Sequence, residues 1–308
     1  DLSYVRSACL TIASVMKSKV LVINESTSYP GTLRDLIKPL IEENSSSSSL
    51  YEYAVSPERV DPGNKSWNLF NTPRLYSGLT SEASNRAKEF YSSFCKELHE
   101  VSSPEVAEAA KLFENTFRQV NIALVNEFAQ IAHALGISVY ETLDAANTKP
   151  YGFMKFLPSA GVGGHCIPVD PSYLSATALE LGVPAKFIDL ANETNLLMAN
   201  YVISRVLHDN PPTLKGKRIQ VVGVAYKPNV ADTRETPAGR LIDGLRSLGA
   251  DVTWHDPLVS NWRGESSSRL GSVDIVILVT NHRVISEMAI MEAAPYIFDT
   301  TGTLSGVP

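Results

Sequence analysis

The chain has 308 residues, 44% hydrophobic and 19% charged, with a formal net charge of −6. This length suggests two domains and a connecting element of ordinary globular composition, and the charge and the absence of a long apolar run argue against nucleic-acid-binding and membrane-spanning proteins. The three cysteines, Cys9, Cys95 and Cys166, form no CxxC, which argues against a disulfide scaffold or a structural zinc site and favours a reducing compartment, the cytoplasm.

The first hundred residues alternate β-rich runs with helical patterns. We expect strands at 19–25, 53–56 and 75–79, and helices at 4–16, 33–43 and 81–96. Alternation at this length predicts a parallel α/β sheet. The polar run from Ser45 to Ser49 is expected to be a solvated loop.

From Pro104 the pattern becomes helical. Residues 106–135 contain no Gly or Pro, which predicts a helix about 45 Å long that connects domains and can pair subunits. Further helices are expected at 139–147, 171–181 and 184–208, and a second α/β block begins after Pro211-Pro212, with strands at 218–224, 251–255, 273–280 and 296–299 and a helix at 237–248. The predicted domains are 1–103, 104–210 and 211–308.

The most specific motif is Gly161-Val-Gly-Gly-His-Cys-Ile-Pro-Val-Asp-Pro171. Its glycines, Gly163 among them, let the backbone and a ligand approach closely. Asp170 and Pro171 are expected to be the N-cap and the first residue of a helix. This would place Cys166 just before a helix N-terminus, where the dipole favours a thiolate. A lone cysteine is more often buried and inert, but the surrounding glycines favour a nucleophile.

Other candidates are weaker on their own. Lys111 and Asn115 are four residues apart on the long helix and share a face, where an amine and a carboxamide can hold an oxyanion, although a solvated stripe has the same spacing. Thr27 and Glu58 each follow a strand, and ligands bind at the carboxyl ends of strands. Glu58 is a candidate for holding or activating water, or a plain surface carboxylate. Arg59 suits an anionic ligand or a bridge to Glu58.

In the second α/β block, the run Gly223-Val-Ala-Tyr-Lys227 follows a strand, and Asp232-Thr-Arg-Glu-Thr-Pro-Ala238 opens a helix. Lys227, Arg234 and the helix N-terminus suit phosphate groups. The run is not GxGxxG, and such turns often contain Gly and charged residues, so this signal is weak by itself.

Together these motifs resemble the nucleotide-sugar 6-dehydrogenases, the UDP-glucose/UDP-N-acetylhexosamine dehydrogenase family. The resemblance is carried by Glu25–Thr32, Ser56–Arg59, Lys111–Asn115, Gly161–Pro171 and Gly223–Ala238. It implies an α/β protein with two Rossmann-like domains joined by an all-helical central domain, NAD as cofactor, a UDP-sugar substrate and a homodimer formed through helix 106–135. The family begins with a strand-GxGxxG-helix unit that this sequence lacks, which implies that roughly 100 residues of the first domain precede residue 1.

The family oxidises C6 of the sugar twice, from alcohol to aldehyde to acid, with two NAD⁺. By resemblance, Cys166 attacks the aldehyde, the thiohemiacetal gives up hydride, and the thioester is hydrolysed. The resemblance assigns oxyanion contacts to Lys111 and Asn115, and water positioning or activation to Thr27, Glu58 and Asp170. The implied cofactor contacts are Thr27, Glu58 and Arg234, and the implied substrate contacts are Glu58, Arg59, Lys111, Asn115, Gly163 and Lys227.

The substrate sugar is the least determined feature. Two segments resemble the UDP-N-acetylglucosamine branch: HCIPVDP at residues 165–171, and Asn147-Thr-Lys-Pro-Tyr-Gly-Phe153. UDP-glucose enzymes carry an arginine in the segment that corresponds to 147–153, and the matching position in this chain is Pro150. Lys149 is a candidate to take the place of that arginine. The alternatives are the same chemistry on UDP-N-acetylmannosamine, UDP-glucose or a TDP-sugar, or an inactive sugar-nucleotide-binding module.

Overall fold

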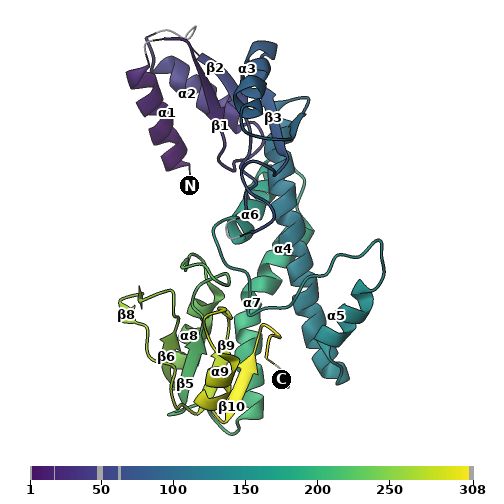
Figure 1. Ribbon diagram of the computed structural model, residues 1–308, viewed down its shortest axis with the longest axis vertical. Coiled ribbons are helices and arrows are strands. Elements are labelled where there is room, and N and C mark those ends of the chain that lie inside the picture. Colours follow the sequence, from purple (N-terminus) through teal and green to yellow (C-terminus); the bar gives the residue numbers. More distant parts are fainter. Residues whose placement is uncertain (1, 17, 47–50, 62–63, 305–308) are drawn as a thin grey trace. The chain divides into compact units, whose positions relative to one another are not determined.

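The computed structural model describes residues 2–16, 18–46, 51–61 and 64–304. They form two compact units (Figure 1). The first unit comprises residues 1–115 and 173–184, and the second comprises 116–172 and 185–308. The solvated loop expected at 45–49 lies partly outside the described residues.

The first unit contains a mixed four-stranded sheet in the order β1-β2-β3-β4. Its elements are α1 (Ser3–Val15), β1 (Val20–Asn24), the π-helix η1 (Thr32–Ile37), α2 (Lys38–Glu43), β2 (Tyr51–Val55), β3 (Arg74–Gly78), α3 (Ser81–Ser92), β4 (Leu98–Glu100) and the beginning of α4 (Pro104–Leu135). The prediction of a wholly parallel sheet is wrong, because β2 and β3 pair antiparallel. Parallel strands need a crossover, usually a helix, and the described residues between β2 and β3 contain none.

The core of the first unit follows from two periodicities. Leu33, Ile37 and Ile41 are spaced four residues apart through η1 and α2 and are buried. They share one hydrophobic cluster with alternate residues of β2, namely Tyr51, Tyr53 and Val55. Ala54, which points to the other face of β2, belongs to a separate cluster. Both faces of this strand are therefore covered.

The second unit contains a parallel sheet in the order β10-β9-β5-β6. Its elements are the rest of α4, α5 (Val139–Asn147), the start of α6 (Cys166–Glu180), α7 (Lys186–Asp209), β5 (Arg218–Val222), α8 (Pro237–Ser247), β6 (Asp251–His255), β7 (Asn261–Trp262), β8 (Glu265–Ser266), β9 (Ile275–Leu278), α9 (Glu287–Ala293) and β10 (Tyr296–Asp299). The chain leaves β5 toward β6 on one side, and β9 lies on the other. Ligands of open α/β sheets bind at the carboxyl ends of strands at such a reversal.

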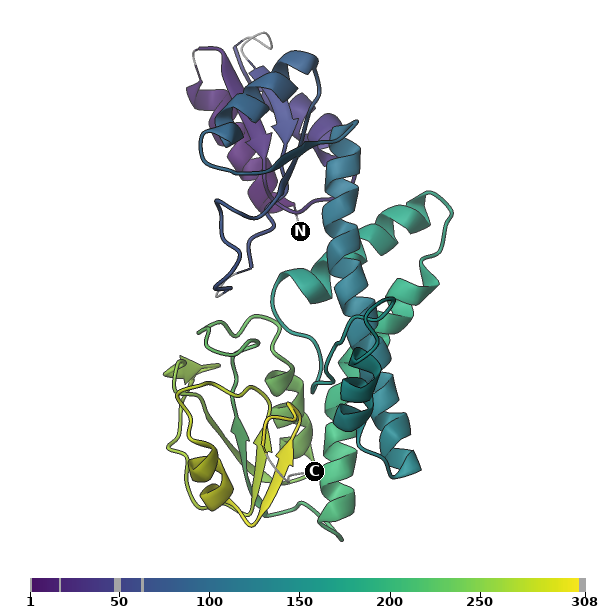
Figure 2. The same ribbon diagram turned by 45° about the vertical axis from the view of Figure 1, so that its right-hand side comes forward.

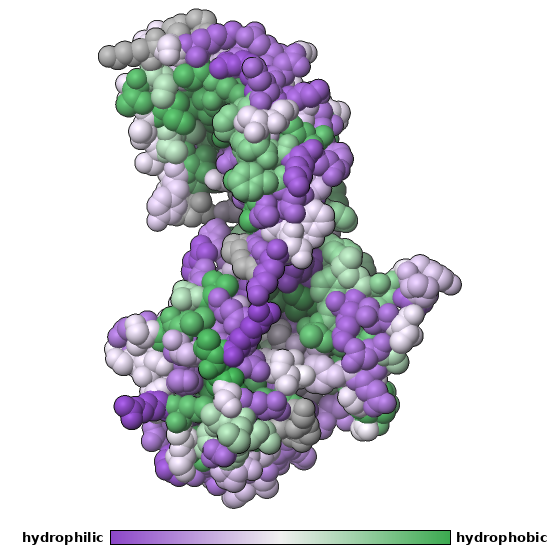
Figure 3. Space-filling model, in the orientation of Figure 1, coloured by the Kyte–Doolittle hydropathy of each residue, from purple (hydrophilic) through white to green (hydrophobic). Residues whose placement is uncertain are grey.

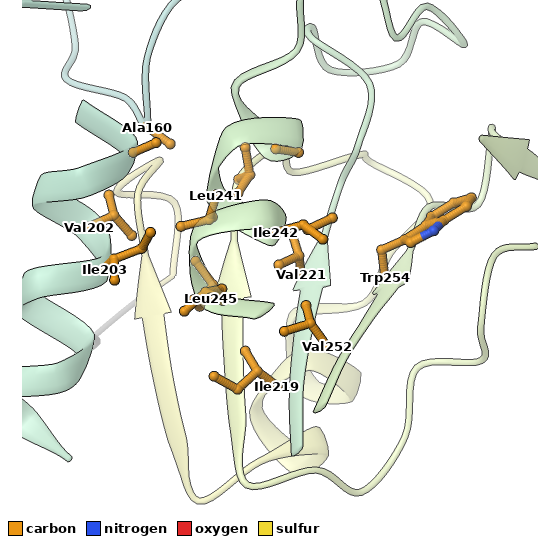
Figure 4. Close-up of a cluster of buried hydrophobic side chains, with 14 of the residues drawn as sticks. Ala160, Val202, Ile203, Ile219, Val221, Leu241, Ile242, Leu245, Val252 and Trp254 are labelled. Carbon is orange, nitrogen blue, oxygen red and sulfur yellow. The ribbon is translucent and has the colours of Figure 1, made fainter. Parts of the chain in front are cut away.

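The burial of β9 explains its unbroken apolar sequence. Ile275 and Ile277 belong to the cluster formed with α7 and α8, and Val276 and Leu278 belong to the cluster formed with α9. Helices on both faces require strands without polar alternation. Figure 4 shows side chains from α7, α8 and the sheet meeting in the first of these clusters.

Gly244 allows α7 and α8 to approach closely. A Cβ at this position would lie 2.4 Å from Cδ1 of Ile203 on α7. At its other end, α8 begins with Pro237 after the N-cap Thr236, whose hydroxyl accepts the N–H of Ala238 at 3.3 Å. These contacts fix the start of α8 directly after the β5–α8 connection.

The helix α4 is uninterrupted from residue 104 to 135 (Figure 2). It begins two residues before the predicted start and ends at the predicted residue.

On the face shown in Figure 3, apolar residues reach the surface among polar ones. None of the helices in the described part of the chain has the length and hydrophobicity that a membrane crossing requires.

Candidate active site

Cys166 is the first residue of α6, and it is exposed. The helix therefore begins at residue 166 and not at Pro171, and the predicted N-cap role of Asp170 is wrong. Pro168 occupies the third helical position, where a backbone N–H has no intrahelical acceptor, so this proline does not prevent the earlier start. Cys166 consequently lies at the positive end of the helix dipole, and Asp170 is buried one turn later, 2% exposed.

The glycines before Cys166 pack against the β5–α8 connection. A Cβ at Gly163 would lie 2.7 Å from Cβ of Tyr226, and one at Gly164 would lie 2.8 Å from Cε2 of the same ring. Gly164 also has a φ of +89°, and its N–H donates to the carbonyl of Arg234 at 2.9 Å. Only glycine meets both requirements at residue 164. The structure thus brings together the two motifs that contain Gly163 and Arg234.

The segment leading to these glycines is held by buried amides. Asn126 of α4 accepts the N–H of Ser159 at 2.8 Å and donates to Oδ1 of Asn195 on α7 at 2.9 Å. Asn195 in turn donates to the carbonyl of Gln119 at 3.2 Å. These bonds satisfy polar groups inside an apolar helix interface, where an unsatisfied amide would be costly. They anchor the approach to Cys166 on two long helices.

Arg234 presents a cation beside the Cys166 loop. Its Nη2 lies 2.6 Å from Oδ2 of Asp232, and its Nε donates to both oxygens of that carboxylate. Asp232 raises the pKa of Arg234, and the thiol of Cys166 contributes to the same shift. The side chain of Arg234 remains 63% exposed and so is accessible to an anionic ligand. Lys227 lies half-buried on the same connection.

In the first unit, the carboxylate of Glu58 is held by four N–H donors. Its Oε1 accepts the backbone N–H groups of Arg59 and Val60 at 2.7 and 2.6 Å. Its Oε2 accepts Nη1 and Nη2 of Arg74 at 3.1 and 2.9 Å. The side chain of Arg59 does not bridge to Glu58 and instead pairs with Glu114 of α4, with Nη2 to Oε1 at 2.7 Å.

Arg74 is a residue that the sequence analysis missed. Its side chain is 5% exposed, pairs with Glu25 and Glu58, and lies 4.5 Å from the centre of the Tyr91 ring. These four residues line a hollow of about 920 Å³ together with apolar side chains and the charged residues Lys19, Arg86 and Glu89. The available signal was an arginine directly before the predicted strand 75–79, a position where burial of an unpaired charge would be costly.

Lys111 and Asn115 lie one turn apart on α4, the lysine half-buried and the asparagine 9% exposed. One turn earlier, buried Glu108 accepts the N–H of Gly31 at 2.7 Å and that of Leu33 at 3.0 Å. Burial raises the pKa of Glu108 to about 7, although these bonds oppose the shift. Glu108, also missed from sequence, fixes the loop that contains half-buried Thr27. The predicted site residues therefore fall into groups in both units.

Three family models match the chain. They describe the NAD binding domain (residues 1–95), the central domain (105–196) and the UDP binding domain (220–306) of the UDP-glucose/GDP-mannose dehydrogenase family. The first and third coincide with the two α/β blocks, and the second contains Lys111, Asn115 and Cys166.

Named relatives agree with this result. A UDP-N-acetyl-D-mannosamine dehydrogenase of Pyrococcus horikoshii is 36% identical over 92% of this chain and 68% of its own length. A UDP-N-acetyl-D-glucosamine 6-dehydrogenase of Pseudomonas aeruginosa is 35% identical over 84% of this chain and 63% of its own length. A solved structure of the Pyrococcus horikoshii UDP-D-ManNAc dehydrogenase superimposes with a TM-score of 0.88 at 33% identity, covering 100% of this chain and 75% of that one. The chain belongs to the UDP-glucose/GDP-mannose dehydrogenase family, the NAD-dependent dehydrogenases of nucleotide sugars.

Proposed function

We propose that the protein oxidises C6 of a UDP-N-acetylhexosamine to the uronic acid through a covalent intermediate on Cys166. NAD⁺, when bound, accepts one hydride in each of two oxidations. The observation that carries the proposal is the exposed thiol of Cys166 at the first residue of α6, directly after a glycine segment that packs on Tyr226. The helix dipole and the nearby guanidinium of Arg234 both favour the thiolate.

The chemistry balances with Cys166 as the nucleophile. The thiolate forms a C–S bond to the aldehyde carbon, and the resulting oxyanion takes a proton. Loss of hydride from that carbon, with loss of the hydroxyl proton, converts the thiohemiacetal into a thioester. Water then adds, and the C–S bond breaks to release the acid and regenerate the thiol.

We propose the supporting roles from the chemistry of the side chains and from their match to the family's motifs. Lys111 and Asn115 supply a cation and an amide donor for the oxyanion. Asp170 is four residues after Cys166 on α6, so the two share a face, and this supports a role in placing the attacking water. Glu58, whose side chain stays 42% exposed while four donors fix its orientation, suits positioning of a ligand or water in the first unit.

The remaining contacts divide between the cofactor and the nucleotide sugar. The hollow containing Glu25, Glu58 and Arg74 offers the mixture of polar and aromatic groups that suits part of a dinucleotide. Thr27 and Arg234 are further proposed cofactor contacts. Arg59, Gly163 and Lys227 are proposed substrate contacts, together with Lys111 and Asn115 on α4.

We infer that the sugar is UDP-N-acetylmannosamine, because relatives of that name match 92–99% of this chain at 34–36% identity. UDP-N-acetylglucosamine is the second candidate. It is favoured by the segment Asn147–Phe153 and by the Pseudomonas aeruginosa relative. The two sugars differ only in configuration at C2, which is remote from the reacting C6.

We also propose a homodimer through α4. Six large apolar side chains on this helix are exposed, at spacings of seven, four, seven, seven and four residues: Val106, Phe113, Phe117, Leu124, Ile131 and Leu135. These spacings return to one narrow face of a helix. An exposed apolar stripe of this kind is typical of a surface that another chain covers.

The decisive test is NADH formation by the purified protein with a panel of UDP-sugars. The unaltered protein should form two NADH per acid, and Cys166→Ser should form no acid. Cys95→Ser, which alters a buried thiol outside the motif 161–171, is the matched control and should retain activity. Unchanged turnover of Cys166→Ser would exclude the covalent mechanism, and the preferred panel member would decide between the two sugars.

A further inference from the structure

Two buried side chains lie beneath the β5–α8 connection. Asp256 follows β6 and His282 follows β9, the two strands that flank β5. Their exposed fractions are 2% and 0%. Both therefore lie under the carboxyl end of β5, where Gly223 begins the connection that carries Lys227.

The pair is bonded to both ends of one loop. Oδ2 of Asp256 accepts the N–H groups of Val224 and Ala225 at 2.9 and 3.0 Å, and lies 3.1 Å from Nε2 of His282. Nδ1 of His282 lies 2.9 Å from the backbone nitrogen of Asn229. Because that N–H donates to Nδ1, the proton of a neutral imidazole belongs on Nε2, where it donates to Asp256.

The loop needs such support. Asn229 has a φ of +63°, a conformation that costs a non-glycine residue free energy unless its surroundings hold it. Between the two anchored ends lie Tyr226 and Lys227. The side chain of Tyr226 packs against the glycines that precede Cys166, with its Cβ next to Gly163 and its ring next to Gly164.

Asp256 itself is not available to a ligand. Besides the three donors at Oδ2, its Oδ1 accepts the N–H of Leu258 at 2.9 Å. Burial acts to raise the pKa of Asp256, but bonds from His282 and from backbone N–H groups lower it overall. The hydrogen bonds of this carboxylate are therefore made with donors of the protein itself.

We propose that the Asp256–His282 pair is a positioning device for nucleotide-sugar binding: it fixes the loop 224–229, and with it Lys227, without touching the ligand. The inference rests on the proposed function, in which Lys227 of this loop contacts the nucleotide sugar. Removing the imidazole leaves the N–H of Asn229 without its acceptor and takes away one of the three donors at Oδ2 of Asp256. The loop should then move, and binding of the nucleotide should weaken.

The experiment compares UDP binding, measured by calorimetry, in the unaltered protein and in His282→Ala. UDP does not react, so its affinity reports the site without the chemistry. We expect about tenfold weaker UDP binding, the size of one lost buried hydrogen-bonding partner. KM for the UDP-sugar should rise similarly. KM for NAD should stay within about twofold, because the loop 224–229 contains none of the proposed cofactor contacts, Thr27, Glu58 and Arg234. His282→Gln, which retains an acceptor and a donor, should recover part of the affinity.

The matched control is Val276→Ala, at a fully buried residue of β9 that packs on the side of α9. It should destabilise the sheet without weakening UDP binding. If His282→Ala does not fold, Asp256→Asn replaces it, with an expected loss of about threefold or more. UDP affinity within twofold of the control in the folded variant would overturn the positioning role. Absence of UDP binding in the unaltered protein would instead overturn the proposed function, and this inference with it.

Discussion

The contact between the cysteine loop and Tyr226 predicts that Gly164→Ala is severely damaging. The φ of +89° costs an alanine about 1–2 kcal/mol. Its Cβ would lie 2.8 Å from Cε2 of Tyr226, and overpacking of this kind costs about 1–3 kcal/mol. The sum is about 2–5 kcal/mol. Because Cys166 is two residues away, displacement of the loop should also lower the rate of NADH formation about 100-fold.

Gly216→Ala separates the two contributions. Gly216 has a φ of +75°, but a Cβ there meets no atom within 4 Å, so this variant loses only the conformational part, about 1–2 kcal/mol. Urea unfolding of both variants measures the difference. Adding Tyr226→Ala should reduce the cost of Gly164→Ala to that of the control, as a double-mutant cycle. Equal losses in the two single variants would refute the close packing of this loop.

Three further predictions concern other parts of the molecule. The pKa of Glu108 is about 7 in the folded protein, against 4.5 for an ordinary glutamate. Protonation of this side chain therefore stabilises the fold fully below pH 4.5, and this stabilisation is lost as the pH rises through 7. The unaltered protein should therefore lose about 3 kcal/mol more unfolding free energy than Glu108→Gln between pH 5 and 8, and parallel pH profiles of the two would contradict the buried protonated state. Arg74→Met removes the donors shared by Glu25 and Glu58. Steady-state kinetics should show a KM for NAD raised about tenfold, with KM for the UDP-sugar unchanged. A raised KM for the UDP-sugar with an unchanged KM for NAD would place the hollow around Arg74 outside the cofactor site. Leu124→Glu, in the middle of the exposed stripe on α4, should shift the mass measured by light scattering from a dimer to a 33.5 kDa monomer, and an unaltered protein that is already monomeric would exclude this interface.

Elements with strong apolar periodicity were predicted well. The bounds of β6 and β10 match residue for residue, and α4 was expected from its 30 residues without Gly or Pro. The short elements β4, β7, β8 and α9 were not predicted, since a few residues carry too little pattern. The start of α6 was misplaced because Asp170-Pro171 is a good local start signal. The helix instead begins where the glycine segment packs on Tyr226, a contact that local sequence does not reveal.

The residues of the candidate site likewise divide into those that could be predicted from the sequence and those that could not. The cysteine motif is contiguous, so its residue types and spacing were visible, and the proposed roles of its members stay predictions. Arg74 and Glu108 act through partners 49 and 77 residues away, Glu25 and Gly31. A buried charge becomes interpretable only when its partner is known, because an isolated one would be prohibitively costly. These pairs could therefore be identified only in the folded structure.

The saturation of Asp256 has a consequence for protein engineering. In dinucleotide-binding Rossmann folds, a carboxylate hydrogen-bonds the cofactor's ribose, and this residue helps to decide which nucleotide is accepted. The carboxylate that follows β6 here already accepts three backbone N–H groups and an imidazole. Substituting it would loosen the loop without offering a new contact to a ribose. Attempts to redirect the nucleotide preference of this block should therefore leave Asp256 and His282 intact and vary the exposed side chains of the β5–α8 connection.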